Sequence, residues 1–500
     1  MELPRTRRLI PVIALLVACN GDSTASESAS DSATAGSTTV ATAGTTQTTT
    51  QGGTASDSDT TTTTQGGTAS DSNTMGTTAT TATTTTTSTS ETTAATTDPT
   101  TTTSTSTTGV DPTTTGDPTT TGDGPCQPGD MMGMGMIEKS FLWVANTDEG
   151  SISKVDTQKV QELARYRSGP SGEAESPSRT AVSVDGRFVV VNNRGTGRVT
   201  MIAANLEDCV DANNNGMIET SQSPADLRPW NGDECVRWTT VLPSVPNDIG
   251  SGPRAVTWTP GEWNEDTCAF ENPKLWVGSR PGDSQARMNR LDGLTGTVEV
   301  AVEFNPWIVG DTYWGPYGAA LDAQENVWFT GLRGNLYKIA TKQNNATQEW
   351  TSPFDSQFYG MTVDDKGRPW TAGCPGPVYR FDPMNQQFQA VGGMGNDCLR
   401  GIGADREGHI WAASNGACGV YQIDADTATL IQFHALNPCN TPVGISTDDE
   451  GFVWVVDEWE GAWKIDPINT NNKQFLPIAS EHYTYSDMTG GQLKSVILPQ

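Results

Sequence analysis

The sequence predicts an all-β fold, a seven-bladed β-propeller with blades of about 45 residues, in residues 137–500. The first observation is a tryptophan repeat, because Trp328, Trp370, Trp411 and Trp454 follow one another at spacings of 42, 41 and 43 residues. The second is their context, since an apolar stretch and a turn precede each tryptophan, as in "VDDKGRPWTAG" and "TDDEGFVWVVD". A period near 40 residues with several short strands per unit is typical of propeller blades.

Three weaker copies, "SFLWVAN", "VDGRFVVVNN" and "PKLWVGS", bring the number of units to seven. A single unit leaves its faces exposed, so neighbouring blades must stack and the ring must close. The final segment, "HYTYSDMTGGQLKSVILP", reads as an inner strand with no tryptophan strand behind it, whereas the strand of Trp143 has little before it. We therefore expect the C-terminal strand to pair with the N-terminal blade.

Residues 20–136 form a separate region that is rich in Thr and Ser and, up to Gly124, contains no aromatic residue. Such a segment buries too little apolar surface to offset the entropy of ordering, so we expect a disordered stalk. The whole chain carries a formal charge of −29, with 59 acidic residues against 30 Lys and Arg. An acidic chain repels phosphate backbones, which argues against nucleic acid as a partner.

Residues 1–19 have the pattern of an export signal, with three arginines followed by a short apolar run that ends at Ala18. The run is too short for a spanning helix. Its end, "LVAC", resembles the lipobox of bacterial lipoproteins, and this resemblance implies cleavage before Cys19 and lipidation of that residue. We expect a lipid anchor in the bacterial cell envelope, in the outer membrane because Asn20 leaves export open. A plain secretory signal with a coincidental cysteine is the alternative.

Eight cysteines remain after Cys19, and an even number in an exported protein suggests disulfides. No CxxC pair or Cys/His cluster suggests zinc. Proximity in the sequence favours three pairs, Cys209–Cys235, Cys374–Cys398 and Cys418–Cys439.

The repeated D-x-x-G-x-Φ-W pattern resembles the virginiamycin B lyase and NHL-type propellers. In the lyases, the resemblance implies a catalytic His and a Glu-Pro-His at the starts of innermost strands. The matching positions here hold Arg400 and Thr441-Pro442-Val443, so such lyase activity would lack its general acid/base. The triplet Glu407-Gly408-His409 falls instead in the turn between the first two strands of its blade, and we expect a turn rather than an acid/base pair.

Equal register in the inner strands places Arg and Tyr side chains at one mouth of the central channel. The aligned residues are Arg179, Arg254, Tyr317, Tyr359 and Arg400, with Val443 in the last blade. Arg offers a planar fork for carboxylate or phosphate, and Tyr adds an apolar face with a hydroxyl. One interpretation is a pocket for an anionic or aromatic ligand. The other is that these side chains fill the mouth and pair with acids or carbonyls of adjoining blades.

An insertion at 203–245 contains a loop that resembles an EF-hand, D-x-[DN]-x-[DN]-G-x-I. The expected calcium ligands are Asp211, Asn213, Asn215, Met217 through its carbonyl, Glu219 and Gln222. Gln222 stands where the motif has a bidentate Glu, so we expect a structural Ca²⁺ site with a dissociation constant on the order of 10⁻⁴–10⁻³ M. The alternative is an Asn- and Gly-rich turn without metal.

The sequence favours a lipid-anchored, calcium-stabilised binding module over an enzyme, with a protein or a small anionic ligand as partner. No G-x-S-x-G, Walker or H-E-x-x-H motif is present. One alternative is an enzyme like virginiamycin B lyase or a lactonase, with a metal in the channel and the arginines stabilising an oxyanion. Another is a structural coat component whose Arg and Tyr side chains are all paired internally.

Overall fold

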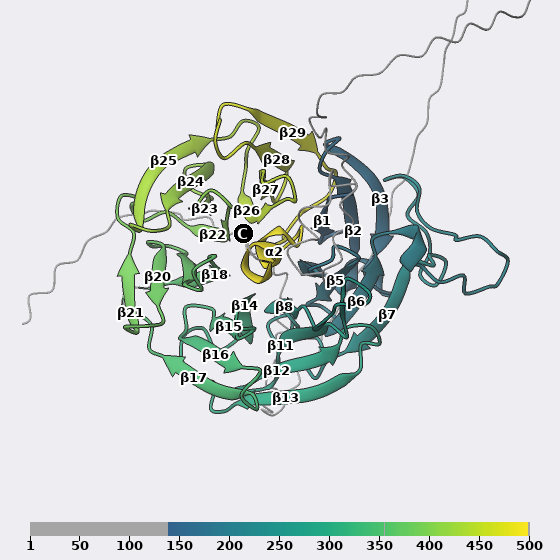
Figure 1. The fold of residues 1–500 in the computed structure, drawn as a ribbon, viewed down its shortest axis with the longest axis horizontal. Helices are drawn as coiled ribbons and strands as arrows, with labels where there is room; N and C mark the ends of the chain where they lie inside the picture. Colours follow the sequence, from purple (N-terminus) through teal and green to yellow (C-terminus); the bar gives the residue numbers. More distant parts are fainter. Residues whose placement is uncertain (1–138, 355, 499–500) are drawn as a thin grey trace, which may run out of the picture. The chain divides into compact units, whose positions relative to one another are not determined.

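The computed structural model describes residues 139–354 and 356–498, and these form a ring of sheets around a central axis (Figure 1). The described residues contain seven blades, six with four antiparallel strands and one with three. The predicted seven-bladed propeller is therefore confirmed. The expected signal peptide, Cys19 and the stalk at 20–136 lie outside the described residues. No helix in the described range is long and apolar enough to cross a membrane.

Each blade is an antiparallel sheet whose strands follow the chain order outward from the axis. Blade 1 holds β1 (Phe141–Asn146), β2 (Ser151–Asp156) and β3 (Gln161–Arg167), and blade 2 holds β4 (Pro177–Val182), β5 (Phe188–Asn193), β6 (Arg198–Ala203) and β7 (Val236–Val241). Blade 3 holds β8 (Val256–Thr259), β11 (Lys274–Gly282), β12 (Gln285–Asp292) and β13 (Val298–Phe304), and blade 4 holds β14 (Pro316–Leu321), β15 (Val327–Gly331), β16 (Leu336–Ala340) and β17 (Ala346–Trp350).

The last three blades repeat the arrangement. Blade 5 holds β18 (Phe358–Val363), β19 (Pro369–Gly373), β20 (Tyr379–Asp382) and β21 (Gln387–Ala390), and blade 6 holds β22 (Leu399–Ala404), β23 (His409–Ser414), β24 (Gly419–Asp424) and β25 (Thr429–Ala435). Blade 7 holds β26 (Pro442–Thr447), β27 (Val453–Asp457), β28 (Gly461–Ile465) and β29 (Lys473–Pro477). Outside the blades lie the hairpin β9 (Glu262–Asn264) and β10 (Ala269–Glu271), the 3₁₀ turns η1 (Gly172–Glu175) and η2 (Leu206–Asp208), and the helix α2 (Gly491–Ile497).

Two ends of the ring can be distinguished by strand direction. The inner strands β4, β8, β14, β18, β22 and β26 are neighbours around the axis and begin at one end, which we call the mouth face. The opposite end carries the turns into the second strands, and we call it the turn face. Because β1 occupies the second-strand position, Phe141 lies toward the turn face and Asn146 toward the mouth face.

The tryptophan repeat is maintained by a buried hydrogen bond within each strong copy. The Asp322 carboxylate accepts the indole N–H of Trp328 at 2.8 Å and also the backbone N–H groups of Gln324 and Asn326. The same bond joins Asp364 to Trp370, Asp405 to Trp411 and Asp448 to Trp454. One carboxylate thus shapes the turn and satisfies the indole, which explains their fixed spacing of six residues.

The C-terminal segment completes blade 1, as expected. The backbone N–H of Thr147 donates to Glu481 O at 2.7 Å, and that of Trp143 donates to Met488 O at 3.0 Å. The segment also forms a parallel bridge between Tyr485 and Arg179 of blade 2. It is irregular rather than a continuous strand, and it is bonded to β1 on one side and to β4 on the other.

Helix α2 is a feature that the sequence reading treated as strand. It lies near the axis in Figure 1, and its residues contact β26, β14 and β18. Lys494 pairs at 2.7 Å with Asp449, which lies in a tight turn of the turn face. The Asp487 carboxylate accepts the backbone N–H groups of Gly490 and Leu493 and so holds the start of the helix. The helix therefore lies at the turn-face end of the channel.

Val189 of blade 2 and Trp276 of blade 3 occupy equivalent positions but lie 87 residues apart, about twice the repeat, and this spacing has two causes. The predicted insertion 203–245 contains β7 of blade 2, so the connecting loop itself spans 204–235, between β6 and β7. The hairpin β9–β10 supplies the remaining extra residues in blade 3. The sequence did not predict the outer strand β7, which follows a polar loop, because its faces are only half-buried.

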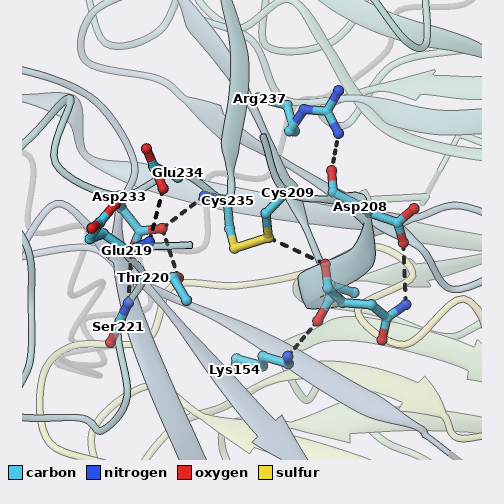
Figure 2. Close-up of a disulfide and its surroundings, with 12 residues drawn as sticks. Lys154, Asp208, Cys209, Glu219, Thr220, Ser221, Asp233, Glu234, Cys235 and Arg237 are labelled. Atoms are coloured by element: carbon cyan, nitrogen blue, oxygen red, sulfur yellow. Dashed lines mark hydrogen bonds between the residues drawn. A yellow bond between two sulfur atoms is a disulfide. The ribbon is translucent and has the colours of Figure 1, made fainter. Parts of the chain in front are cut away.

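Three disulfides are formed as predicted, Cys209–Cys235, Cys374–Cys398 and Cys418–Cys439. Figure 2 shows the first of these at the base of the 204–235 loop, with Arg237 donating to Asp208 O beside it. The Asp233 carboxylate accepts the Thr220 hydroxyl and the backbone N–H of Ser221. The loop is therefore fastened at both ends.

Candidate functional site

The five residues aligned by register converge around the channel axis. The guanidinium of Arg179 lies 4.9 Å from the ring centre of Tyr317, and that of Arg254 lies 5.5 Å from the same ring. The Tyr317 hydroxyl donates to the Tyr359 hydroxyl at 3.0 Å, and Arg400 lies 5.7 Å from the Tyr359 ring. We call these five residues, together with the contacting residues added below, the channel cluster.

Close packing of the inner strands positions these side chains. Glycine follows the cluster residue in four consecutive inner strands, in "YG", "YG", "RG" and "VG". A Cβ atom on Gly360 would lie 2.2 Å from Arg400 O, and one on Gly401 would lie 2.3 Å from Val443 O. Only glycine allows this approach, and the residue before it consequently lies at the same depth in these four blades.

Two tyrosines of the C-terminal segment join the channel cluster. The Tyr483 hydroxyl lies 2.9 Å from that of Tyr317 and also contacts that of Tyr359. The Tyr485 hydroxyl donates to Tyr359 at 3.3 Å, and its ring lies 4.0 Å from the Arg179 guanidinium. The sequence analysis did not predict these two tyrosines as site residues. The predicted closure of the ring nevertheless places "HYTYS" at the same register as the other inner strands.

Three further members come from loops. The guanidinium of Arg194 lies 4.5 Å from the Tyr483 ring, and that of Arg254 lies 4.2 Å from the Trp314 ring. Glu458 accepts a hydrogen bond from Arg400 at 3.1 Å. These residues lie outside the inner strands, so the register argument had no means of finding them.

Positive charge exceeds negative charge in the channel cluster. Arg179 and Arg254 are 2% and 1% exposed, yet within the described chain neither forms an ion pair with a carboxylate. Arg179 donates to Ser178 O, and Arg254 donates through Nη1 to Ile249 O. The Nε and Nη2 groups of Arg254 are buried without any hydrogen-bond partner in that part of the structure. Unpaired buried charge is among the most costly features a fold can carry.

Burial and charge shift several pKa values here. Burial lowers the pKa of Arg254, and the nearby cations Arg194 and Arg179 lower it further. Burial raises the pKa of Glu458 to about 7, although its partner Arg400 opposes that shift. Among the described residues the cluster thus contains one ion pair, Arg400–Glu458, beside three guanidiniums without a carboxylate partner, those of Arg179, Arg194 and Arg254. Internal pairing, the alternative considered from the sequence, accounts for Arg400 and leaves Arg254 unexplained.

The positions that match the catalytic residues of the lyases have other roles here. Arg400 pairs with Glu458, and the backbone N–H of Thr441 donates to Asp457 at 2.8 Å. The triplet Glu407-Gly408-His409 is a turn, with Gly408 at φ +82°. His409 begins β23 at the turn face and contacts the Asp405 carboxylate at 2.9 Å. It therefore lies at the end of the blade away from the channel cluster.

The candidate calcium loop gathers four of its six predicted ligand residues. Asn213 and Asn215 donate their side-chain N–H groups to the two Glu219 oxygens at 2.9 and 2.6 Å. Asp211 accepts the backbone N–H groups of Asn215 and Gly216. Gly216 has φ +84°, the conformation that the sharp turn of such loops needs.

The other two predicted ligand residues have different surroundings. Met217 donates its backbone N–H to Asn215 Oδ1 at 2.8 Å, and its side chain is exposed. Gln222 contacts Thr220 O and Asp226 rather than the loop carboxylate. Glu234, which the sequence analysis did not predict, accepts the backbone N–H groups of Ala212 and Glu219, each at 2.9 Å. Figure 2 shows the contact with Glu219. Glu234 brings a third carboxylate to the loop because the disulfide holds the two loop ends together.

No protein-family model and no curated protein matches the chain. Among solved structures, a streptogramin B lyase is 19% identical with a TM-score of 0.46, over 63% of this chain and 86% of that one. Virginiamycin B lyase from Staphylococcus aureus is 14% identical with a TM-score of 0.43, over 63% and 90%. Apo AztD from Citrobacter koseri is 14% identical with a TM-score of 0.43, over 69% and 97%. At these identities the similarity concerns the propeller fold alone.

Proposed function

We propose that this protein is a binding protein whose channel cluster takes up a small ligand bearing a carboxylate or phosphate group. The observation that carries the proposal is Arg254, a buried guanidinium with two N–H-bearing nitrogens directed to no acceptor in the described structure. An anion that reaches Arg254 and Arg179 supplies the missing charge and the missing acceptors together. The planar fork of Arg suits an oxyanion with two oxygens.

Aromatic side chains favour a flat organic acid among such ligands. The Trp314 ring contacts both Arg254 and the ring of Tyr317. Next to it, the Tyr313 ring lies 4.8 Å from that of Trp314 and is 46% exposed. These aromatic faces lead from the surface to the buried guanidiniums. They offer apolar contact to the body of a ligand whose charged end binds Arg254.

The test measures thermal stability in the presence of benzoate, inorganic phosphate and chloride, for the wild type, Arg254→Met and the control Arg290→Met. Arg290 lies on β12 and pairs with Glu299, outside the channel. We expect benzoate or phosphate to raise the Tm of the wild type and of Arg290→Met and to leave Arg254→Met unchanged. Without ligand, Arg254→Met should be at least as stable as the wild type, because an uncompensated buried charge is removed. A ligand response that survives in Arg254→Met contradicts the proposal.

We further propose that the propeller is held at the bacterial cell envelope through lipidated Cys19, in the outer membrane. The lipobox-like "LVAC" supports this proposal, since several acyl chains anchor stably where one is marginal. Labelling of cells with a fatty-acid analogue should mark the wild type and not Cys19→Ser. Release of the unlabelled variant from the membrane fraction completes the test, and equal membrane retention of both contradicts the anchor.

The loop at 211–219 supports a structural calcium ion as part of the same proposal. Asp211, Glu219 and Glu234 supply carboxylates, and the two asparagines supply amide oxygens after rotation of their side chains. Oxygen ligands of this kind suit Ca²⁺. The ion would order the loop between the two outer strands of blade 2, β6 and β7, and would take no part in ligand binding.

A further inference from the structure

Tyr483 has a different environment from the other tyrosines of the channel cluster. Guanidiniums lie 4.5 Å from its ring centre in Arg194, 5.6 Å in Arg179 and 5.9 Å in Arg400. Its hydroxyl contacts the hydroxyls of both Tyr317 and Tyr359. It also retains part of its surface, whereas Tyr317 and Tyr485 are nearly fully buried.

The groups that face Tyr483 come from every element packed against the channel cluster. The cations are Arg179 on β4, Arg194 after β5, Arg254 before β8 and Arg400 on β22, and the carboxylates are Glu458 after β27 and Glu481 on its own segment. The phenols are Tyr317 on β14, Tyr359 on β18 and Tyr485. His482 is directed elsewhere, with its ring nitrogens on Asn146 and Ile478 O. Within the described ranges, four cations therefore meet two carboxylates, one of which is already paired with Arg400.

The hydroxyl hydrogens can be arranged so that Tyr483 needs none of its own. The single hydroxyl hydrogen of Tyr317 can be directed to Tyr359 or, instead, to Tyr483. In the second case Tyr485 donates to Tyr359, and Tyr317 and Tyr359 both donate to Tyr483. A phenol whose oxygen accepts two hydrogen bonds, and whose ring centre lies 4.5–5.9 Å from three guanidiniums, ionises more readily than a phenol without these contacts. The other three tyrosine hydroxyls keep their protons as donors in this arrangement.

We propose that at alkaline pH Tyr483 is the internal counter-ion of the ligand-free channel cluster, a phenolate that takes up one proton when an anionic ligand binds. The inference rests on the proposed anion-binding function. In the binding step one O–H bond forms at Tyr483 Oη with a proton from solvent, and the ligand brings the negative charge that the phenolate gives up. The net charge of the cluster is the same before and after binding.

The electrostatic balance agrees with this assignment. Burial raises the pKa of Tyr483, but Arg400, Arg179 and Arg194 outweigh that effect and bring the pKa down to about 8. Burial instead raises the pKa of Tyr359 and of Tyr485 well above the usual range. One tyrosine of the four is thus set apart for ionisation.

The first experiment is an ultraviolet difference titration of tyrosinate in the ligand-free protein. We expect one tyrosine to ionise with a midpoint near pH 8 in the wild type and in the control Tyr313→Phe, and this step to be absent from Tyr483→Phe. Tyr313 is a suitable control because it is 46% exposed. A wild-type protein whose tyrosines all titrate near pH 10 or above overturns the inference, whatever ligands the protein binds.

The second experiment is calorimetry with benzoate and inorganic phosphate as probes, in two buffers of different ionisation enthalpy. Above pH 8 we expect uptake of about one proton per bound anion, and a dissociation constant that rises about tenfold per pH unit. Tyr483→Phe should show neither effect and should bind more tightly than the wild type at high pH. Anion binding without proton uptake above pH 8 overturns the inference and leaves the proposed function standing. Absence of binding by either probe, together with a tyrosinate step near pH 8, counts against the proposed function alone.

Discussion

Asp322 and Trp328 are joined by a hydrogen bond of 2.8 Å that lies wholly within the core of blade 4. The same carboxylate accepts backbone N–H groups from the turn between β14 and β15. We predict that Asp322→Ala lowers the free energy of unfolding by about 3 kcal/mol, because the indole and two backbone donors lose their acceptor in a buried site. Urea denaturation followed by tryptophan fluorescence measures the effect.

Asp365 is the matched control for that substitution. It lies in the corresponding turn of blade 5 but is exposed, next to the buried Asp364 that bonds Trp370. Asp365→Ala should change the free energy of unfolding by no more than about 0.5 kcal/mol. Equal losses for the two variants would mean that the carboxylate–indole bond has no special role in the blade.

Calcium should stabilise the protein measurably. With a dissociation constant near 10⁻³ M, calcium at 10 mM would add about 1.4 kcal/mol to the free energy of unfolding, if the loop unfolds with the propeller. We predict a rise in Tm of about 2 °C on addition of calcium to chelated protein, and no rise for Asp211→Ala. Asp226→Ala serves as the control, since Asp226 lies outside the gathered ligands and pairs with Arg228. A calcium response that persists in Asp211→Ala would rule out this loop as the site.

Two buried histidines should make the protein sensitive to mild acid. Burial lowers the pKa of His434 and of His482 to about 4. Because the unfolded chain binds these protons near pH 6.5, the stability is fully present above pH 6.5 and declines as the pH falls toward 4. His434→Phe keeps the stacking on Trp411 and should flatten the fall of Tm across this range.

His409 should have the opposite effect on the pH dependence of folding stability. Its hydrogen bond with Asp405 raises its pKa, so its contribution is present below pH 6.5 and is lost as the pH rises through the folded value. His409→Gln should therefore make the protein less stable at pH 5 than the wild type and change it little at pH 8. If His434→Phe and His409→Gln change the stability at acid pH in the same direction, the assignment of these two environments is wrong.

Closure of the ring should depend on the C-terminal segment. We predict that Asp487→Ala lowers the free energy of unfolding by about 2–4 kcal/mol, because the start of α2 and the Ser446 hydroxyl both lose a buried acceptor. Deletion of residues 481–500 should remove cooperative unfolding, since blade 1 then has only three strands and an open edge. A deletion variant with a wild-type transition would contradict this role.

The sequence predicted the propeller because its strongest signal, the Asp–Trp pair, recurs at one depth in every strong copy. Register then placed Arg179, Arg254, Tyr317, Tyr359 and Arg400 together without any knowledge of the structure. The outer strand β7 was not predicted because its side chains are only half-buried or exposed, so its pattern differs little from that of a loop. Helix α2 was not predicted because its seven residues are too few to show a helical periodicity.

The rest of the channel cluster depends on loops whose paths no repeat determines. Arg194, Trp314 and Glu458 reach the axis from three different connections. To predict Tyr483 as a member of the channel cluster takes two inferences. The first is that the C-terminal segment closes blade 1, and the second is that its register equals that of the other inner strands. The charge imbalance around Arg254 becomes visible only when the carboxylates of residues 139–354 and 356–498 have positions. Calcium binding and the lipid anchor stay predictions.

The hydrogen bonds between blade 1 and residues 481–488 also determine the order in which the blades can be completed during synthesis. Its three strands are synthesised first, yet the edge of β1 stays without its partner until nearly the whole polypeptide has left the ribosome. Blades 2 to 7 carry all their strands in consecutive sequence, apart from their loops, and can form as they emerge. The arginines are thus brought together around Tyr483 only in the last event of folding, so a prematurely terminated chain carries no assembled cluster.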